Sequence, residues 1–450
     1  MMSIQPQSHS ATGVCDIDAQ PMVFHCNHYN RTLQQTIENC RHIDSRSILI
    51  HAAAEVSFLG LKQHFLMHPE LNITERLAYA EALYAYCGFG LLPLVATLKA
   101  AQGQSAFKLS TASSHYGQAL ALNFEKRRFA GEYFDLGFVI GTLMATFGFA
   151  VQGRLTNEAL SLKHKQTTME IELGGEEFAY LFQLESGTTA YLSAVGVSAE
   201  VPERKVRSSV DEHAIIQTLS QITFAGNQYG LIPAFGVQLT RHYADYYNLV
   251  SFRFEQQLTQ ALAQRPSLTD LLVYDYPALF YYRQYIDLRG LSLSRTLLIE
   301  AGHICGFNTM GGIMSSEAWD QKIMPMIQTR EDWLHGIIAV INTLGWGVWR
   351  ISELVPDEQL VIRVWHPYES LGYLRWFGMA DHPIDYLVQG VAASLMNLVY
   401  EGDITERPAL TPQYYQQINR SSTSFWAEQS ACVAMGDEYS EVKVTRRKRQ

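Results

Sequence analysis

The chain has 450 residues, of which 47% are hydrophobic and 17% are charged, and its formal net charge at pH 7 is -10. A single core stops growing near about 250 to 300 residues, so the length predicts two or three globular domains. The negative charge disfavours nucleic acid as a partner, and the six cysteines, which form no C-x-x-C pair, fit neither a disulfide framework nor a zinc ribbon.

The first residues carry no targeting signal. Residues 1–22 lack the basic start and the apolar run of a secretory signal, so we expect a flexible N-terminus, a cytoplasmic protein and reduced thiols. An uncharged stretch at residues 136–151 is too short for a bilayer span, and it predicts a buried helix.

The stretch FHCNHYNR, residues 24–31, concentrates reactive side chains near the N-terminus. If it is helical, His25 and His28 share a face and could bind one iron, zinc or copper ion. Nearby imidazoles also favour the thiolate of Cys26, which makes Cys26 a candidate nucleophile with His28 as its catalytic partner. The alternative is ordinary packing, in which an amphipathic helix runs from about Asn27 to Glu38 and the histidines cap it or face solvent.

An internal repeat organises the rest of the chain. Residues 46–58 (RSILIHAAAEVSF) align without gaps on residues 295–307 (RTLLIEAGHICGF). Further landmarks follow in the same order, and both copies of the second one end in Gly-aromatic-Gly: residues 79–90 and 336–347, residues 106–117 and 361–372, residues 136–151 and 386–400, and residues 157–173 and 427–444. Several landmarks in one order predict a duplication. In this duplication FHCNHYNR precedes the first copy, and its counterpart before the second copy is residues 274–285 (YDYPALFYYRQY), which keep the aromatic residues but contain no His or Cys.

The sequence of each copy predicts a helix, a second helix, a strand with a turn, a third helix, and a pair of strands in which apolar and polar residues alternate. This pattern predicts an α+β fold, with an antiparallel sheet carrying helices on one side. We place the copies at residues 23–175 and 271–445 and a basic tail at residues 446–450. The connecting helical or mixed segment, residues 176–270, includes a helix at residues 208–222, capped by Ser209 with Glu212, and a helix at residues 242–254.

Several side chains in the two copies are candidate ligand contacts. His115, with Tyr116 beside it, and His366 follow corresponding strands, at loops where binding groups often lie. In an extended segment His303 and Cys305 would point to one side and could reach one ligand. Trp346 is a further candidate lining residue, as are Trp349, Trp365 and Phe89. His242 and Asp245 would share a helical face, as an acid–base pair or as a surface hydrogen bond.

The end of the second copy resembles the 4-vinyl reductase-like domain family. The resemblance is carried by the pattern E-x3-C-x3-G-D-x2-S, followed by alternating EVKV: Glu428, Cys432, Gly436, Asp437 and Ser440. It implies two small α+β domains, packed as a pseudo-dimer, that bind hydrophobic or aromatic molecules. A serine stands where the family has its second cysteine, and in the first copy Leu162 takes the position of Cys432, so a structural zinc at either ending is disfavoured.

The leading hypothesis is therefore the binding of a hydrophobic or aromatic small molecule, within a biosynthetic or sensing pathway. The competing hypothesis is a metal- or cysteine-dependent reductase or hydrolase of a small heterocyclic substrate, and a third is an assembly factor similar to vesicle-tethering subunits. No P-loop, G-x-G-x-x-G, G-x-S-x-G or H-E-x-x-H motif occurs. The sequence leaves open whether the chain is an enzyme and whether it pairs with another protein or with a second copy.

Overall fold

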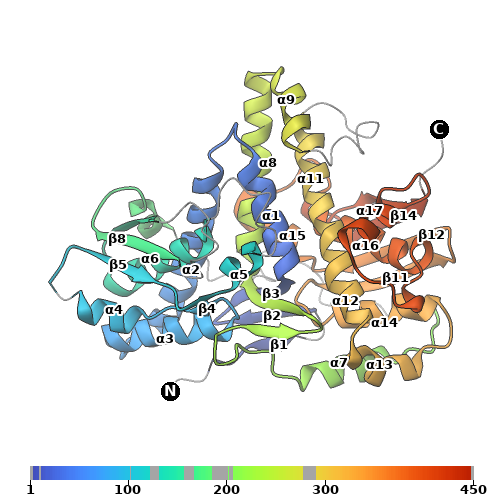
Figure 1. The fold of residues 1–450 in the computed structure, drawn as a ribbon, viewed down its shortest axis with the longest axis horizontal. Coiled ribbons are helices and arrows are strands. Elements are labelled where there is room, and N and C mark those ends of the chain that lie inside the picture. Colours follow the sequence, from blue (N-terminus) through green and yellow to red (C-terminus); the bar gives the residue numbers. More distant parts are fainter. Residues whose placement is uncertain are drawn as a thin grey trace.

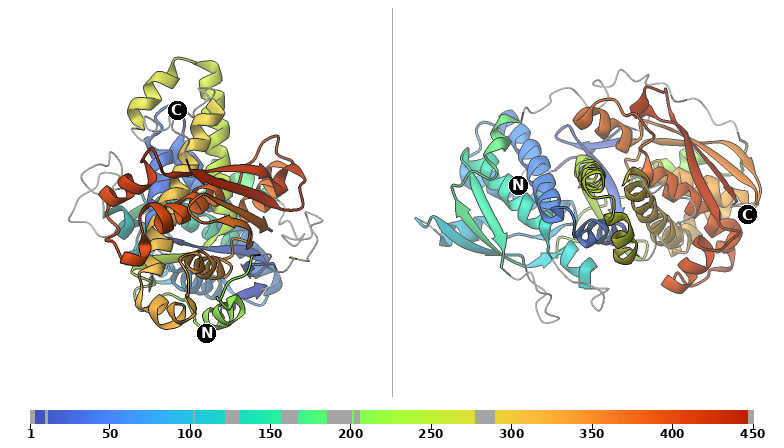
Figure 2. Two further views of the ribbon diagram at one scale, coloured as in Figure 1. Left: turned by 90° about the vertical axis from the view of Figure 1, so that its right-hand side faces the viewer. Right: turned by 90° about the horizontal axis from the view of Figure 1, so that it is seen from above.

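The protein is an α+β fold built from several antiparallel sheets and many helices. The computed structural model describes residues 4–9, 12–101, 103–121, 131–156, 167–184, 201, 206–276 and 290–446. Two sheets lie at opposite ends of the long axis, and helices α1, α8 and α11 stand between them (Figure 1). The view from above shows the same arrangement, with strands at both ends and helices in the middle (Figure 2).

The first part of the chain contains three strands at its start and one unit of helices and sheet strands. Its elements are β1 (Gln7–His9), β2 (Val14–Ile17), β3 (Gln20–Cys26), α1 (Asn27–Asn39), α2 (Ser45–Met67), α3 (Ile73–Tyr86), β4 (Gly90–Leu91), α4 (Leu94–Ala100), β5 (Ala106–Ser110), β6 (Ser113–Ser114), α5 (His115–Ala121), α6 (Tyr133–Phe147), β7 (Val151–Leu155), β8 (Thr168–Leu173) and η2 (Ala179–Gln183).

A connecting part and a second unit follow. The connecting elements are α7 (Glu212–Ser220), β9 (Ile232–Ala234), β10 (Val237–Tyr243), α8 (Ala244–Gln264) and α9 (Leu268–Asp275). The second unit contains α11 (Gly290–Cys305), η4 (Gly306–Met310), α12 (Gly311–Met314), α13 (Glu317–Lys322), η5 (Met324–Met326), α14 (Glu331–Ile341), β11 (Val348–Val355), β12 (Gln359–Trp365), α15 (Tyr368–Phe377), α16 (Tyr386–Met396), η6 (Asn397–Glu401), η7 (Ile404–Glu406), α17 (Pro412–Asn419), β13 (Phe425–Ala431), η8 (Val433–Met435) and β14 (Ser440–Arg446).

The two units have the same sheet topology. The first sheet has the order β5-β8-β7, and the second has the order β11-β12-β14-β13 with all neighbours antiparallel. Thus β5, β8 and β7 correspond to β12, β14 and β13, and β11 is an added edge strand. Helix α6 packs against β7 as α16 packs against β13. The structure therefore repeats the order of elements that the sequence repeat predicted.

The central helix pair of each unit shows the repeat at the level of single atoms. A Cβ added to Gly137 of α6 would lie 2.4 Å from the carbonyl oxygen of Ile50 on α2. A Cβ added to Gly390 of α16 would lie 2.3 Å from the carbonyl oxygen of Ile299 on α11. Ile50 and Ile299 are matched residues in the gap-free alignment, so both glycines allow the same close helix crossing.

The described residues near the N-terminus form strands β1, β2 and β3, which corrects the expectation of a flexible N-terminus. Strands β2 and β3 pair as a hairpin whose two central residues, Asp18 and Ala19, have φ of 52° and 60°. Such turns favour Asn-Gly or Asp-Gly, so the Asp-Ala pair gave only a weak hairpin signal. The hairpin joins β1, β10 and β9 in one sheet with the order β1-β2-β3-β10-β9.

The connecting segment differs from the prediction in two places. Helix α7 is capped by Asp211, whose side chain accepts from Ala214 N, while Ser209 donates to Asp332 at 2.8 Å. The predicted helix at residues 242–254 begins two residues late, because His242 still belongs to β10. The pair of His242 with Asp245 on one helical face is therefore wrong, and Asp245 instead pairs with Arg375 at 2.8 Å.

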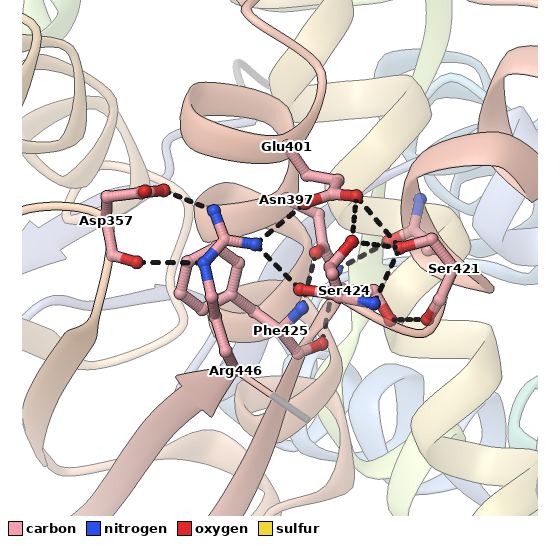
Figure 3. Close-up of polar contacts among 9 residues, drawn as sticks. Asp357, Asn397, Glu401, Ser421, Ser424, Phe425 and Arg446 are labelled. Carbon is pink, nitrogen blue, oxygen red and sulfur yellow. Dashed lines mark hydrogen bonds and ion pairs between the residues drawn. The ribbon is translucent and has the colours of Figure 1, made fainter. Parts of the chain in front are cut away.

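The basic C-terminus is folded at least to Arg446, which corrects its placement in a solvated tail. Strand β14 ends at Arg446, and the guanidinium reaches three segments, as Figure 3 shows. It donates to Glu401 Oε2 at 2.7 Å and to the carbonyl oxygen of Asp357 at 2.9 Å, and it lies over the Phe425 ring. Residues 447–450 lie outside the described residues.

A helix that spans a bilayer must be both long and apolar. The expected buried helix at residues 136–151 exists as α6, and its residues are almost all buried within the first unit. In the described part of the chain, no helix has the combined length and apolar character of a membrane span.

Candidate functional site

The stretch FHCNHYNR forms a junction between a strand and a helix. Strand β3 ends at Cys26 and α1 begins at Asn27, with the Cys26 side chain capping the helix by accepting from Tyr29 N. His25 is therefore a strand residue, and the helical face that it was predicted to share with His28 does not exist. The helix expected from ordinary packing, from about Asn27 to Glu38, is confirmed and covers Asn27–Asn39.

His25 is fully buried among four aromatic rings. Its imidazole stacks on Tyr29 and on Trp346, with centroid distances of 4.3 and 4.9 Å. Tyr247 and Tyr368 contact it edge-on at 4.5 and 5.9 Å. We call these five residues the His25 cluster. They come from β3, α1, α8, α15 and the turn before β11, so distant parts of the chain meet at this imidazole.

The His25 cluster is apolar but carries a few directed hydrogen bonds. The hydroxyl of Tyr368 lies 3.4 Å from Nε2 of His25, and Trp346 Nε1 donates to the carbonyl oxygen of Phe24 at 3.0 Å. Burial holds the pKa of His25 well below its usual value, because desolvation disfavours the imidazolium. The ring is thus neutral at pH 7 and can accept one hydrogen bond and donate another.

A second cluster of the same design surrounds His242 at the end of β10. Its imidazole stacks on Tyr246 at 4.5 Å and contacts Phe89 at 4.8 Å and Phe134 at 4.3 Å. The hydroxyl of Tyr116 lies 3.1 Å from Nε2 of His242. We call these five residues the His242 cluster. Burial also lowers the pKa of His242 well below its usual value, helped by the neighbouring imidazoles.

The two clusters are related by the internal repeat, and the strand–helix junctions are exchanged: each junction lies on the unit that it does not directly precede in the chain. The junction β3–α1 lies on Trp346, from the Gly-Trp-Gly turn of the second unit, whereas β10–α8 lies on Phe89, from the Gly-Phe-Gly turn of the first. Equivalent backbone hydrogen bonds hold the two junctions in place. Phe24 N donates to Leu344 O, and Arg241 N donates to Cys87 O, each at 2.9 Å.

This arrangement corrects the assignment of a counterpart to FHCNHYNR. The sequence suggested residues 274–285, most of which lie outside the described residues, whereas the structural counterpart is residues 241–248, RHYADYYN. His25 with Tyr29 and His242 with Tyr246 have the same H-x3-Y spacing and the same stacking. The counterpart therefore keeps the histidine, and it replaces Cys26 by Tyr243.

Polar groups connect the two clusters. Tyr247 contacts both imidazoles, at 4.5 Å from His25 and 4.8 Å from His242, and donates to Asn30 Oδ1 at 2.6 Å. Asn30 Nδ2 lies 3.0 Å from Nε2 of His115, whose pKa burial lowers to about 3. Within the described residues, Nδ1 of His115 and Nδ1 of His242 have no hydrogen-bond partner. Buried polar atoms without a partner are uncommon and call for an explanation.

A pair of thiols borders the His25 cluster. Thr309 Oγ1 donates to Cys26 Sγ at 2.6 Å and lies 3.7 Å from Cys305 Sγ, which is 4.0 Å from Nδ1 of His25. Although burial opposes it, the donors at Cys305, Thr309 and the backbone N–H of Tyr29 lower the pKa of Cys26 to about 7. Burial and the neighbouring Cys26 raise the pKa of Cys305.

The predicted pairing of His303 with Cys305 is wrong, because the segment is helix α11 and not a strand. Residues two apart on a helix point in different directions. His303 lies edge-on to Trp426 at 5.3 Å and within 3.4 Å of Glu300, while Cys305 Sγ lies 3.7 Å from the Thr309 hydroxyl. A π-helical turn, η4, follows Cys305 and brings Thr309 to the two thiols.

The remaining predicted residues take separate positions. His28 is partly exposed on α1, where burial and Arg31 lower its pKa to about 4. His366 is buried at the end of β12, where its φ is 55° and its carbonyl lies against Gly347. No three His, Cys, Asp or Glu side chains among the described residues are placed to hold one metal ion.

The cysteine ending of the second unit forms a closed hydrogen-bond network. Asp385, fully buried at the start of α16, accepts from Ser440 Oγ at 2.5 Å and from Ser370 Oγ at 2.8 Å. Cys432 Sγ donates to the same carboxylate at 3.6 Å. The counterpart position in the first copy, Leu162, lies outside the described residues.

One concavity opens on the surface, away from both clusters. It has a volume of about 520 Å³ and lies over the sheet β5-β8-β7. Its lining is mostly charged or polar and includes Lys108, Arg154, Glu170 and Glu172. A lining of that kind is unlike the apolar walls expected for an aromatic ligand.

Comparisons with known proteins give little further information. No family model matches the chain, and no curated protein is significantly similar. Among solved structures, the chain is similar to the crystal structure of the phenol-responsive sensory domain of the transcription activator PoxR with phenol. The identity is 13%, the match covers 42% of this chain and 74% of that chain, and the TM-score is 0.25.

Proposed function

We propose that the protein binds a small aromatic molecule at the His25 cluster. The observation that carries the proposal is a neutral imidazole with no solvent exposure, enclosed by four aromatic rings from distant parts of the chain. Aromatic walls with a few directed polar groups are the usual composition of a small-molecule site.

The contact between Tyr368 and His25 indicates the chemistry of the ligand. The phenol hydroxyl of Tyr368 lies 3.4 Å from Nε2 of His25, and a ligand hydroxyl or ring N–H could take that place. A buried imidazole is costly compared with a phenylalanine of similar shape, unless its nitrogen serves a purpose. We therefore expect the ligand to be an aromatic ring that carries one hydrogen-bond donor.

The rings in the cluster are in contact, so binding requires Tyr29, Trp346 or Tyr368 to move. A single aromatic ring buries about 150 to 250 Å², worth about 4 to 6 kcal/mol at about 25 cal/mol per Å². That corresponds to dissociation constants between roughly 1 mM and about 40 μM, before the cost of moving a ring.

The repeat extends the proposal to the whole chain. The two units would be 4-vinyl reductase-like domains packed as a pseudo-dimer, as the sequence resemblance implies. Exchange of the two strand–helix junctions between the units supports this view, because neither cluster is complete within one unit. The His242 cluster would be the second, equivalent position for a ligand.

Isothermal titration calorimetry with phenol, indole, toluene and cyclohexane tests the proposal. We expect phenol and indole to bind the wild type, and Trp346→Ala to remove the binding position at the His25 cluster, so that fewer molecules bind per chain. His25→Phe should weaken phenol about 2- to 12-fold, the worth of one hydrogen bond, and leave toluene unchanged. Trp319→Phe is the matched control, because Trp319 is also buried but lies 5.4 Å from Trp333 and outside both clusters. Equal phenol binding by the wild type, Trp346→Ala and His25→Phe would exclude the site.

A further inference from the structure

The thiol pair next to the His25 cluster is not needed to hold an aromatic ring or to build the fold. The repeat provides the comparison: Cys26 corresponds to Tyr243, and Thr309 corresponds to Gly60 when the gap-free alignment of residues 46–58 with 295–307 is extended by two positions. A Cβ on Gly60 would lie 3.3 Å from the Tyr243 ring, so in the first unit an aromatic ring fills this space. The same scaffold is thus built without sulfur.

Three independent features converge on Cys26. It caps α1, so its sulfur receives the Tyr29 N–H at 3.4 Å at the positive end of the helix dipole. Thr309 donates a second hydrogen bond, at 2.6 Å. The turn that carries Thr309 is π-helical, a local irregularity that is frequent at functional sites and that here follows Cys305 directly.

The position of Cys305 makes the site a pair. Its sulfur lies 3.7 Å from the Thr309 hydroxyl, which also donates to Cys26 Sγ at 2.6 Å. Both cysteines have no solvent exposure, and helix α1 packs against α11. The two thiols share the Thr309 hydroxyl. Cys26, which is stabilised as the thiolate, has the role of an attacking cysteine, and Cys305, which remains a thiol, has the role of a resolving cysteine.

We propose that Cys26 and Cys305 are a redox-active dithiol that a small hydroperoxide oxidises to an intramolecular disulfide. The Cys26 thiolate attacks the terminal peroxide oxygen and breaks the O–O bond, giving Cys26 sulfenic acid. The thiol proton ends on the leaving hydroxide or alkoxide, as water or alcohol. The Cys305 thiol then attacks the Cys26 sulfur and displaces water, so one hydroperoxide is reduced and two thiols are oxidised.

A small, neutral oxidant is the class that fits. The aromatic rings of the His25 cluster and the helices α1 and α11 enclose the thiols, which excludes a protein disulfide as the oxidant. The disulfide would tie the β3–α1 junction to helix α11 of the second unit, beside the imidazole. This inference does not depend on ligand binding, since it rests on the sulfur contacts alone.

Mass spectrometry of the full-length protein tests the proposal. The reduced protein is treated with hydrogen peroxide, alkylated, and mapped without reduction. We expect the mass to fall by about 2 Da and a linked peptide pair to contain Cys26 and Cys305. In Cys305→Ser, Cys26 should remain as the sulfenic acid, about 16 Da heavier and trapped by dimedone. Cys87→Ser, which removes another fully buried thiol, should still form the link.

Three results would overturn the proposal. One is a wild type that keeps both thiols after peroxide treatment, and a second is a link between other cysteines, such as Cys15 with Cys87. The third is equal dimedone labelling in Cys305→Ser and in Cys26→Ser with Cys305→Ser. The peptide map of the wild type needs no variant, so a variant that fails to fold does not affect that result.

Discussion

Replacing Thr309 by valine removes the hydroxyl from Cys26 and keeps the shape of the side chain. The bond from Thr309 Oγ1 to Cys26 Sγ is 2.6 Å long and is one of the donors that bring the pKa of Cys26 to about 7. A hydrogen bond to a charged group is worth about 1.5 to 3 kcal/mol, or about 1 to 2 pKa units. We therefore expect the pKa of Cys26 to rise to about 8 or 9 in Thr309→Val.

Thiolate absorbance as a function of pH measures this pKa, with Cys26→Ser as the spectrum to subtract and Thr309→Ser as the control that keeps a hydroxyl. Linkage gives a second readout. The folded pKa lies below the unfolded one, so the unfolded state holds the proton between about pH 7 and 9, and the stability of the wild type rises with pH there. The stability gap to Thr309→Val should widen over that interval by about 1.5 to 3 kcal/mol. Identical titrations of wild type, Thr309→Val and Thr309→Ser would refute the reasoning.

Three further predictions concern the fold. Gly390→Ala would place a Cβ 2.3 Å from a carbonyl oxygen of α11, and urea unfolding should show a loss of stability of about 1 to 3 kcal/mol. As a control, Gly312→Ala places its Cβ no closer than 3.3 Å to a neighbour and should change the stability little. Burial and Asp135 raise the pKa of Glu132 to about 8, so the wild type loses stability from about pH 5 to 8, and Glu132→Gln should flatten that loss. Arg446→Ala removes the charged partner of Glu401, which keeps only its hydrogen bonds from Ser421 and Thr423, and should lower the thermal midpoint through a loss of about 1 to 3 kcal/mol, with only partial recovery in Arg446→Lys.

The sequence repeat predicted much of the fold because the two units obey the same packing constraints. The gap-free match of residues 46–58 with 295–307 places Ile50 opposite Gly137 and Ile299 opposite Gly390, a contact that only a small residue allows. The same match should have identified residues 300–305 as helical, since its partner lies in a long apolar helix. The alternation of His303 and Cys305 was a weaker signal than that match.

The candidate site was only partly predictable. His25, Cys26, Cys305 and Trp346 were each singled out from local composition, but a local pattern cannot show that they meet, because the contact joins residues 280 positions apart. Tyr247, Tyr368 and Thr309 had no local signal. The second cluster did have a sequence signal, because His242 and Tyr246 repeat the H-x3-Y spacing of His25 and Tyr29. Residues 274–285, the counterpart chosen from the sequence, do not contain this spacing.

The most direct test of the central claim is a crystal structure of the protein soaked with 4-bromophenol, with the bromine located by anomalous scattering. The account predicts a bromine peak in contact with the rings of the His25 cluster, together with a displaced Tyr29, Trp346 or Tyr368. An absence of any peak at saturating ligand, or a peak only in the charged concavity over the sheet β5-β8-β7, would contradict it.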